Sequence, residues 1–190
     1  MAESKKKLDV TLVDNVTFQT EDKTYHGDCV GQVGVETEMR NKKKTCAGVE
    51  VDSITKTVGV NVTVTANLEP SAYYEIYDFK TEGLKKDIYG YNIDSKGAMT
   101  TVLLVAHDEM ENTKKLMIFP KARIGNGISL AFDNDSEDVA KLTLEFKTYP
   151  DDQGNFFYEV FNTAENESVI KQALEKYTFE VIAGSGEVGA

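Results

Sequence analysis

The stretch Val58–Ala66, VGVNVTVTA, sets the fold class of this chain. Its valines and its alanine fall at every second position, and Gly, Asn and Thr occupy the positions between them. A β-strand points successive side chains to opposite faces, so this alternation predicts a strand with one buried face and one exposed face. The stretch Val139–Tyr149 repeats the pattern, with four apolar residues from Ala140 to Phe146 on one face. Alternation of this kind favours antiparallel sheets.

Further runs rich in β-branched and aromatic residues predict more strands. They are Leu8–Val13, Val30–Val35, Val49–Ile54, Thr100–His107, Leu116–Phe119, Ile128–Phe132, Phe156–Phe161 and Tyr177–Ala183. Most of these runs are flanked by Gly, Asn or Asp, which are common turn residues. About ten strands is the number expected of a β-sandwich or a β-barrel.

Two segments break the β pattern and predict helices. After Pro70, four residues from Tyr73 to Lys80 fall at helical spacing, and proline suits the first turn of a helix. From Asn166 to Tyr177, an apolar stripe lies opposite a charged and polar face. We expect this second helix to lie with its stripe against one outer face of a sheet.

The length of 190 residues fits a single domain. We expect an N-terminal arm at residues 1–7, one domain at residues 8–183 and a flexible C-terminal tail at residues 184–190, because the two ends lack the large apolar side chains of a core. No apolar run approaches the length of about 18 residues that a membrane-spanning helix needs, and no secretory signal is recognisable. These features predict synthesis in the cytoplasm and no membrane partner.

The residues that would carry catalytic or metal chemistry are few. Cys29 and Cys46 form no CxxC unit, which favours reduced thiols over a zinc site. His26 and His107 have no nucleophile motif beside them. The acidic run Asp133–Asp138 lacks the turn glycine of a calcium loop and predicts a solvated turn. We therefore expect no enzyme activity, no metal site and no cofactor.

The segment Glu36–Gly48, ETEMRNKKKTCAG, predicts a long irregular loop. Such a loop is uncommon in a compact β domain and usually binds a partner, although a mobile hairpin tip is the alternative. It contains the cluster Lys42-Lys43-Lys44, in a chain whose net charge is -11. Without interleaved aromatic residues, the cluster is a weak signal for nucleic acid, and it fits an acidic protein neighbour.

Several motifs in the middle and C-terminal parts of the chain follow a recognisable order. They are Leu84-Lys-Lys-Asp-Ile-Tyr-Gly-Tyr91, Asp94-Ser-Lys-Gly97, the run Val102–Ala106, Phe119-Pro-Lys-Ala122, Ile128–Phe132, and Val139–Phe146 followed by Tyr149-Pro-Asp-Asp152. In this order they resemble the major tail proteins, or tail tube proteins, of long-tailed, non-contractile bacteriophages of Gram-positive hosts. The resemblance covers the chain from Val30 to Ala183.

This resemblance implies a mainly β fold with two packed antiparallel sheets, one flanking helix and a long loop, as in phage tail tubes and type VI secretion tubes. It implies hexameric rings that stack head to tail into the tail tube of a virion, through which double-stranded DNA passes without specific binding. The implied partners are further copies of the chain, a tape measure protein, and tail initiator and terminator proteins.

The resemblance also gives roles to particular residues. The segment Glu36–Gly48 becomes the loop that reaches the adjoining ring, and its contact residues would be Met39, Arg40, Lys42, Lys43 and Lys44. Thr143 and Glu145, on the polar face of the strand Val139–Tyr149, become candidates for the tube lumen or the junction between sheets. A neutral or acidic lining suits a conduit, because a basic lining would hold DNA phosphates.

Two other interpretations stay open. One is a stand-alone β-sandwich module for carbohydrate binding or adhesion, which would have the same composition and strand number. Tryptophan is absent, but five tyrosines offer aromatic rings for sugars: Tyr73, Tyr74, Tyr77, Tyr89 and Tyr91. The other is the tube subunit of a contractile injection system, which an accompanying sheath subunit would reveal.

Overall fold

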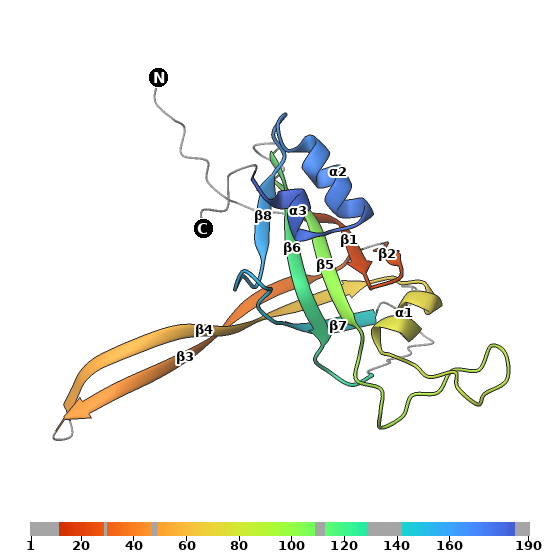
Figure 1. Cartoon of the computed structure of the whole chain (residues 1–190), viewed down its shortest axis with the longest axis horizontal. Helices are drawn as coiled ribbons and strands as arrows, with labels where there is room; N and C mark the ends of the chain where they lie inside the picture. The colour runs from red at the N-terminus through yellow and green to blue at the C-terminus, as the bar shows by residue number, and fades with distance from the viewer. Residues whose placement is uncertain (1–11, 29, 47–48, 109–112, 129–141, 185–190) are drawn as a thin grey trace.

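The computed structural model describes residues 12–28, 30–46, 49–108, 113–128 and 142–184. These residues form a large antiparallel sheet with a few short helices, which confirms the mainly β fold expected from the sequence (Figure 1). The strands are β1 Leu12–Gln19, β2 Thr24–Gly27, β3 Val33–Cys46, β4 Val49–Ala66, β5 Met99–Asp108, β6 Thr113–Ile124, β7 Leu142–Thr148 and β8 Tyr158–Phe161. The helices are α1 Pro70–Ile76, α2 Glu167–Glu175 and α3 Phe179–Ile182.

The sheet has the strand order β2-β1-β5-β6-β7-β4-β3, and β8 pairs with β6 outside this path. Strand β6 is the corner of the fold. Its residues 115–118 pair with β8, and its residues 122–124 pair with β7. The two expected layers are therefore two halves of one hydrogen-bonded sheet, and Figure 1 shows β5 and β6 crossing the direction of β3, β4 and β7.

The main core lies between these two halves. The rings of Phe18 in β1 and Phe146 in β7 stack with their centroids 5.6 Å apart, although β1 and β7 are not neighbours in the sheet. Their contact shows that the sheet folds over on itself. In β4, Val60, Val62 and Val64 are buried in this core. The alternation of VGVNVTVTA thus marks a core strand, as the sequence predicts.

A second, smaller core covers the opposite face of β5 and β6. Its buried residues are Leu103, Leu116, Ile118 and Ala173. Ala173 belongs to α2, so the helix predicted from Asn166 to Tyr177 lies against an outer face of the sheet, as expected. Helix α1 likewise begins at Pro70, where the sequence predicts a helix.

Several segments differ from the sequence prediction or lie outside the described residues. The strand predicted at Tyr177–Ala183 is wrong, because Phe179–Ile182 form α3 and two of its apolar side chains pack into the second core. Strand β1 spans Leu12–Gln19 and so extends beyond the predicted Leu8–Val13, of which residues 8–11 lie outside the described residues. Strand β2 was not predicted. The N-terminal arm 1–7, the acidic run 133–138, residues 129–132 and nearly all of the tail 184–190 lie outside the described residues.

The loop predicted at Glu36–Gly48 is also wrong, because β3 continues to Cys46. The two strands predicted at Val49–Ile54 and Val58–Ala66 are one strand, β4. Together β3 and β4 form a long hairpin, whose outer part we call the arm (residues 36–46 and 49–58). The described side chains of the arm are all exposed, so neither of its faces needs the apolar alternation that would reveal a strand.

Candidate interaction surface

The arm projects from the body of the molecule as a two-stranded ribbon (Figure 1). Strand β7 pairs with β4 only from Val60 to Ala66, so the ribbon leaves the main sheet near Gly59. At about 3.3 Å per residue, an arm of roughly ten residue pairs reaches about 33 Å. Among the described residues, the arm makes backbone ladder contacts only within the hairpin. It therefore presents both its faces and its backbone edges to the surroundings.

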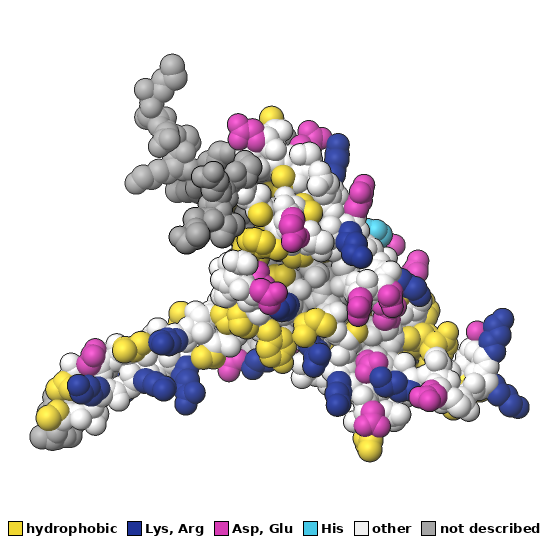
Figure 2. Space-filling model, in the orientation of Figure 1, with side chains coloured by type: hydrophobic (Ala, Val, Ile, Leu, Met, Phe, Trp, Pro, Cys, Tyr) yellow, Lys and Arg dark blue, Asp and Glu magenta, His cyan; other side chains and the backbone are white. Residues whose placement is uncertain are grey.

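One face of the arm is basic and carries a groove, and Figure 2 shows Lys and Arg side chains along the arm. Residues directly opposite each other in an antiparallel pair share a face, and here Arg40 faces Lys56 while Lys42 faces Ile54. These four side chains and Val58 line a shallow groove of about 310 Å³, which we call the basic groove. Three cations thus surround two apolar side chains that are each about half exposed, Ile54 at 56% and Val58 at 43%.

The contact residues predicted from the sequence do not all lie on this face. Arg40, Lys42 and Lys44 alternate along β3, and so share the face of the basic groove. Met39 faces Thr57 and Lys43 faces Ser53, on the other side of the ribbon. The structure therefore divides the five predicted residues into two sets.

Sequence reasoning missed the β4 side of the basic groove. Ile54 and Val58 belong to segments that were predicted as separate strands, and Lys56 lies between those segments. The signal that finds them is the register of the hairpin, in which Met39 pairs with Thr57 and Cys46 pairs with Val49. That register depends on where the hairpin turns, which periodicity along one strand does not give.

An ion pair joins the base of the arm to the body. Lys147 of β7 donates to Glu38 of β3 over a distance of 3.0 Å and so spans β4, which lies between them. The ion pair passes over Gly59 of β4, where an added Cβ atom would lie at van der Waals distance, 3.4 Å from Glu38 Oε2 and 3.6 Å from Lys147 Cε. The hydrogen bond to Glu38 and its negative charge raise the pKa of Lys147, so this ammonium group stays protonated below pH 10.5.

Thr143 and Glu145, the predicted lumen or junction residues, lie on the exposed face of β7. Thr143 Oγ1 is 3.0 Å from Thr65 Oγ1 of β4, and Glu145 faces Thr63. By strand alternation they share this polar face with Lys147, and hence lie beside the base of the arm. Their role in a lumen or junction stays a prediction.

The other end of the molecule holds α1 and the long connection of residues 77–98 (Figure 1). The two segments pack together through aromatic rings. Tyr74 stacks on Tyr89 with centroids 4.1 Å apart, and Phe79 contacts Tyr91 at 5.4 Å. Tyr73 lies 4.9 Å from Tyr77. The five tyrosines considered for sugar binding thus pack largely against one another and against Phe79. They hold the connection to the helix.

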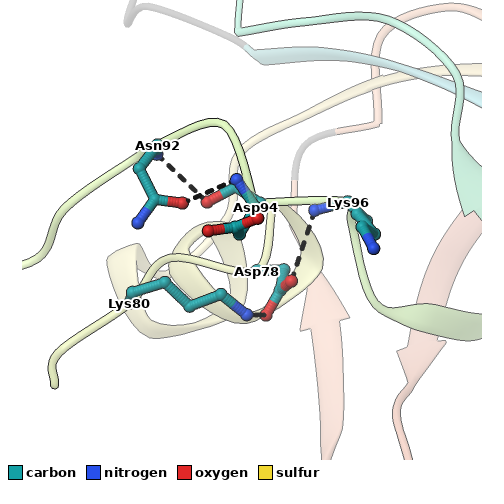
Figure 3. Close-up of polar contacts among 6 residues, drawn as sticks. Asp78, Lys80, Asn92, Asp94 and Lys96 are labelled. Atoms are coloured by element: carbon teal, nitrogen blue, oxygen red, sulfur yellow. Dashed lines mark hydrogen bonds and ion pairs between the residues drawn. The ribbon is translucent and has the colours of Figure 1, made fainter.

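Asp78 ties the two ends of this connection together (Figure 3). Its carboxylate accepts a hydrogen bond from Lys80 Nζ at 2.6 Å and another from the backbone nitrogen of Lys96 at 3.3 Å. Burial alone would raise the pKa of Asp78, but these hydrogen bonds and the charges of Lys80 and Arg123 outweigh it, so the pKa lies below its ordinary value. Asn92 in turn accepts a hydrogen bond from the backbone nitrogen of Asp94 at 2.9 Å.

A second groove, of about 440 Å³, lies between the β1–β2 turn, the C-terminal end of α1 and the start of β5. We call it the acidic groove. Its charged lining residues are Glu21, Asp22, Glu75, Asp78 and Arg123, and its apolar lining includes Tyr74, Phe79 and Met99.

Within the acidic groove, Glu75 is held in place by hydrogen bonds from the hydroxyl groups of Thr20 and Tyr25. Burial and this hydrogen bond raise the pKa of Tyr25, so its phenol remains a neutral donor. Glu21 and Asp22 lie at the tip of the β1–β2 turn and are exposed. The groove therefore combines two partnered carboxylates, Glu75 and Asp78, with two exposed ones, Glu21 and Asp22.

Each of the two histidines lies beside a polar side chain of β1. His26 Nδ1 lies 3.1 Å from Thr17 Oγ1, and His107 Nδ1 lies 2.7 Å from Asp14 Oδ1. In the part of the chain that the structure describes, no group of three or more His, Cys, Asp or Glu side chains is placed to hold a metal ion. None of the described helices has the length and hydropathy needed to cross a membrane.

Comparisons with known proteins find similarity to solved structures but none in sequence. No protein-family model matches the chain, and no curated protein matches it in sequence. Among solved structures, the chain is similar to the tube terminating cap of the anti-feeding prophage, with a TM-score of 0.43 and 12% sequence identity. The match covers 86% of this chain and 100% of that chain.

Proposed function

We propose that this chain is a structural, non-catalytic subunit of a phage tail, in which copies form stacked hexameric rings and the rings build the tail tube. Double-stranded DNA would leave the virion through that tube without specific binding. Two grounds support the proposal: the arrangement of sequence motifs that resembles tail tube proteins, and the arm of the structure. The arm is the observation that carries it.

The arm has the properties of a contact element. Met39 is 63% exposed, and Val51 and Ile54 are each 56% exposed, so the ribbon shows apolar side chains to water at several places. An isolated two-stranded ribbon is only marginally stable, and open strand edges are prone to pair with other chains. Contact with another copy covers these side chains and edges. The exposed arm therefore favours assembly of the chain over the monomer.

The charge of the chain fits a DNA conduit. The net charge is -11, and a lumen lined by carboxylates and neutral polar groups binds phosphates weakly. Thr143 and Glu145 are our candidates for that lining or for the junction between sheets. The tape measure protein and the tail initiator and terminator proteins are the expected partners besides further copies of the chain.

A shortened hairpin tests this proposal. Glu38 and Gly59 face each other across β3 and β4, so residues 39–58 can be replaced by Asn-Gly, which suits a two-residue hairpin turn. Deleting residues 39–46 alone would leave the outer part of β4 without its partner strand. We expect the full chain to form rings or tubes in negative-stain electron microscopy, and the shortened chain to remain in small species.

Circular dichroism during urea unfolding provides the control. Because the described side chains of the arm are all exposed, the shortened chain should unfold within about 1 kcal/mol of the full chain. If the shortened chain still forms tubes of normal length, the arm has no role in stacking the rings. A full chain that stays monomeric at every concentration, with and without the tail-initiating proteins, would overturn the proposal itself.

A tube in a contractile injection system would use the same surfaces. A sheath subunit that binds the assembled tube in co-sedimentation would identify that system, and its absence from the source particle would favour the non-contractile tail.

A further inference from the structure

The two grooves lie at opposite ends of the molecule. Figure 1 is drawn with the longest axis horizontal, and the arm extends to one side while α1 and the connection 77–98 lie at the other. The basic groove is on the arm, and the acidic groove is at the C-terminal end of α1. A contact between them must therefore join two different copies.

The two grooves are also complementary in chemistry. Arg40, Lys42 and Lys56 surround apolar side chains in one, and Glu21 and Asp22 stand beside exposed apolar surface in the other. The net charge of the arm is also opposite in sign to that of the rest of the chain. Residues 36–58 contain five basic and four acidic residues, a net charge of +1, so the remainder of the chain carries -12.

The acidic side offers a protruding element that can enter a groove. The β1–β2 turn is closed by hydrogen bonds between Thr20 and Lys23, including one from the backbone nitrogen of Thr20 to the carbonyl oxygen of Lys23 at 2.9 Å. This leaves the exposed Glu21 and Asp22 at its tip. Beside the turn, Met99 is 42% exposed and provides an apolar contact.

We propose that the β1–β2 turn of one copy docks into the basic groove on the arm of a second copy. Glu21 and Asp22 of the first copy lie against Arg40, Lys42 and Lys56 of the second, and Met99 packs near Ile54. This inference rests on the proposed function, because it names the surface that the arm contacts in an assembly.

The arrangement explains why such an assembly grows. Each copy offers its arm at one end and its turn at the other, so the contact uses two different surfaces and leaves one of each free. Contacts of this kind continue from copy to copy until a ring closes or a filament extends. Complementary charge also sets the order of the partners and speeds their encounter.

Cysteine cross-linking tests the contact directly. In a chain with Cys29→Ser and Cys46→Ser, the pair Ile54→Cys and Met99→Cys should give a ladder of cross-linked oligomers with a short bismaleimide. Thr55→Cys with Met99→Cys is the matched control, because residue 55 lies on the opposite face of the arm from residue 54. The control pair should give little product. Dimers from Ile54→Cys alone would instead indicate contact between two arms and overturn the proposal.

Charge reversal gives a second, independent test. Lys42→Glu changes the basic groove, whereas Lys43→Glu makes the same change of charge on the other face of the arm. We expect Lys42→Glu to weaken self-association by about tenfold or more in sedimentation velocity, and Lys43→Glu to have a much smaller effect. Adding Glu21→Lys to the Lys42→Glu chain should restore most of the lost association.

The outcomes separate this inference from the proposed function. If tubes form but the ladder is missing and the two lysine variants behave alike, the docking is wrong and the tube remains. If the ladder forms while electron microscopy shows only short chains without rings or tubes, the docking stands and the proposed function fails. If neither tubes nor cross-linked products form at any concentration, both are overturned.

Discussion

Gly97 shows how a single residue holds the long connection against the body. It is buried, its φ is +73°, and a Cβ atom at this position would lie only 2.4 Å from Ile124 Cγ2. Gly83, in the same connection, has nearly the same φ of +74° but nothing within 4 Å of the added atom. Alanine substitutions at the two glycines therefore separate the free-energy cost of backbone strain from the free-energy cost of a steric clash.

We predict that Gly97→Ala destabilises the protein by about 3 kcal/mol or more, and Gly83→Ala by about 1 kcal/mol. The backbone conformation is unfavourable for alanine at both positions, but only residue 97 adds the overlap with Ile124. Urea unfolding followed by circular dichroism measures both. Equal losses would mean that the packing between residue 97 and β6 contributes nothing.

Asp78 makes the order of the same connection depend on pH. Its pKa in the folded protein lies below the ordinary value of 3.8, so its ionised form stabilises the connection at pH values above 3.8. This contribution is lost as the pH falls through the folded-state pKa. It is modest, because the side chain is about a third exposed.

We predict that residues 79–96 lose protection from hydrogen exchange below about pH 4, before the core strands do. The variant Asp78→Asn should show reduced protection already at neutral pH, with little further change on acidification. A connection with the same acid response in Asp78→Asn would assign the effect to other carboxylates.

At the scale of elements, α2 is fastened to the sheet by one buried side chain. Gln19 Nε2 donates hydrogen bonds to the carbonyl oxygens of Ala173 at 2.9 Å and Leu174 at 3.0 Å. Gln19 Oε1 accepts a hydrogen bond from the backbone nitrogen of Tyr177 at 2.8 Å. One amide thus satisfies both donors and acceptors at the C-terminal end of the helix.

We predict that Gln19→Glu costs about 2 to 4 kcal/mol at neutral pH, because a carboxylate faces two carbonyl oxygens and cannot donate to them. Acidification protonates the carboxyl group and should recover part of the loss relative to the unmodified chain. Hydrogen exchange in α2, compared with exchange in β4, shows whether the helix detaches. If the hydrogen exchange of α2 is unchanged in this variant, Gln19 is not the main attachment of the helix to the sheet.

Periodicity predicted those elements that bury one face. Val60, Val62 and Val64 alternate with polar residues because one side of β4 packs in the core, and the stripe of α2 reflects its contact with the sheet. The segment Tyr177–Ala183 misled the prediction, since its β-branched and aromatic residues are typical of strands. In the folded protein this segment forms a short helix that packs into the second core, so tertiary packing overrides its local strand propensity.

The arm shows where sequence reasoning stops. Both faces of its strands are exposed, so neither face has to be apolar and the sequence shows no alternation of apolar and polar residues. A polar stretch without alternation is typical of a loop, which is why a loop was predicted here. The sequence did locate the basic residues Arg40 and Lys42. It could not place Lys56 beside them, because that depends on the register of a long hairpin.

At the scale of the whole molecule, the arm has a net charge of +1 and the rest of the chain a net charge of -12. Between copies, the repulsion that results from a net charge of -11 on each chain acts over long distances, whereas the proposed contact brings opposite charges close together. The screening length is about 10 Å at 0.1 M salt and about 3 Å at 1 M. Most of the long-range repulsion is therefore screened at 0.1 M already.

We predict that raising salt from about 0.1 M to about 1 M slows assembly of the full chain by about tenfold, as the close attraction weakens. In the Lys42→Glu chain the same change should have little effect or a small accelerating one. Light scattering after dilution from a dissociated state follows both. Assembly that speeds up with salt in the full chain would show that apolar contacts dominate.

The arm, whose described side chains pack against no core, also bears on how this protein diversifies. Mutations there should spare the stability of the body, so in the proposed assembly the fit to a neighbouring subunit is what restrains them. In descendants of this gene, substitutions at residues 40, 42 and 56 should arise in step with compensating changes at residues 21 and 22, and seldom on their own.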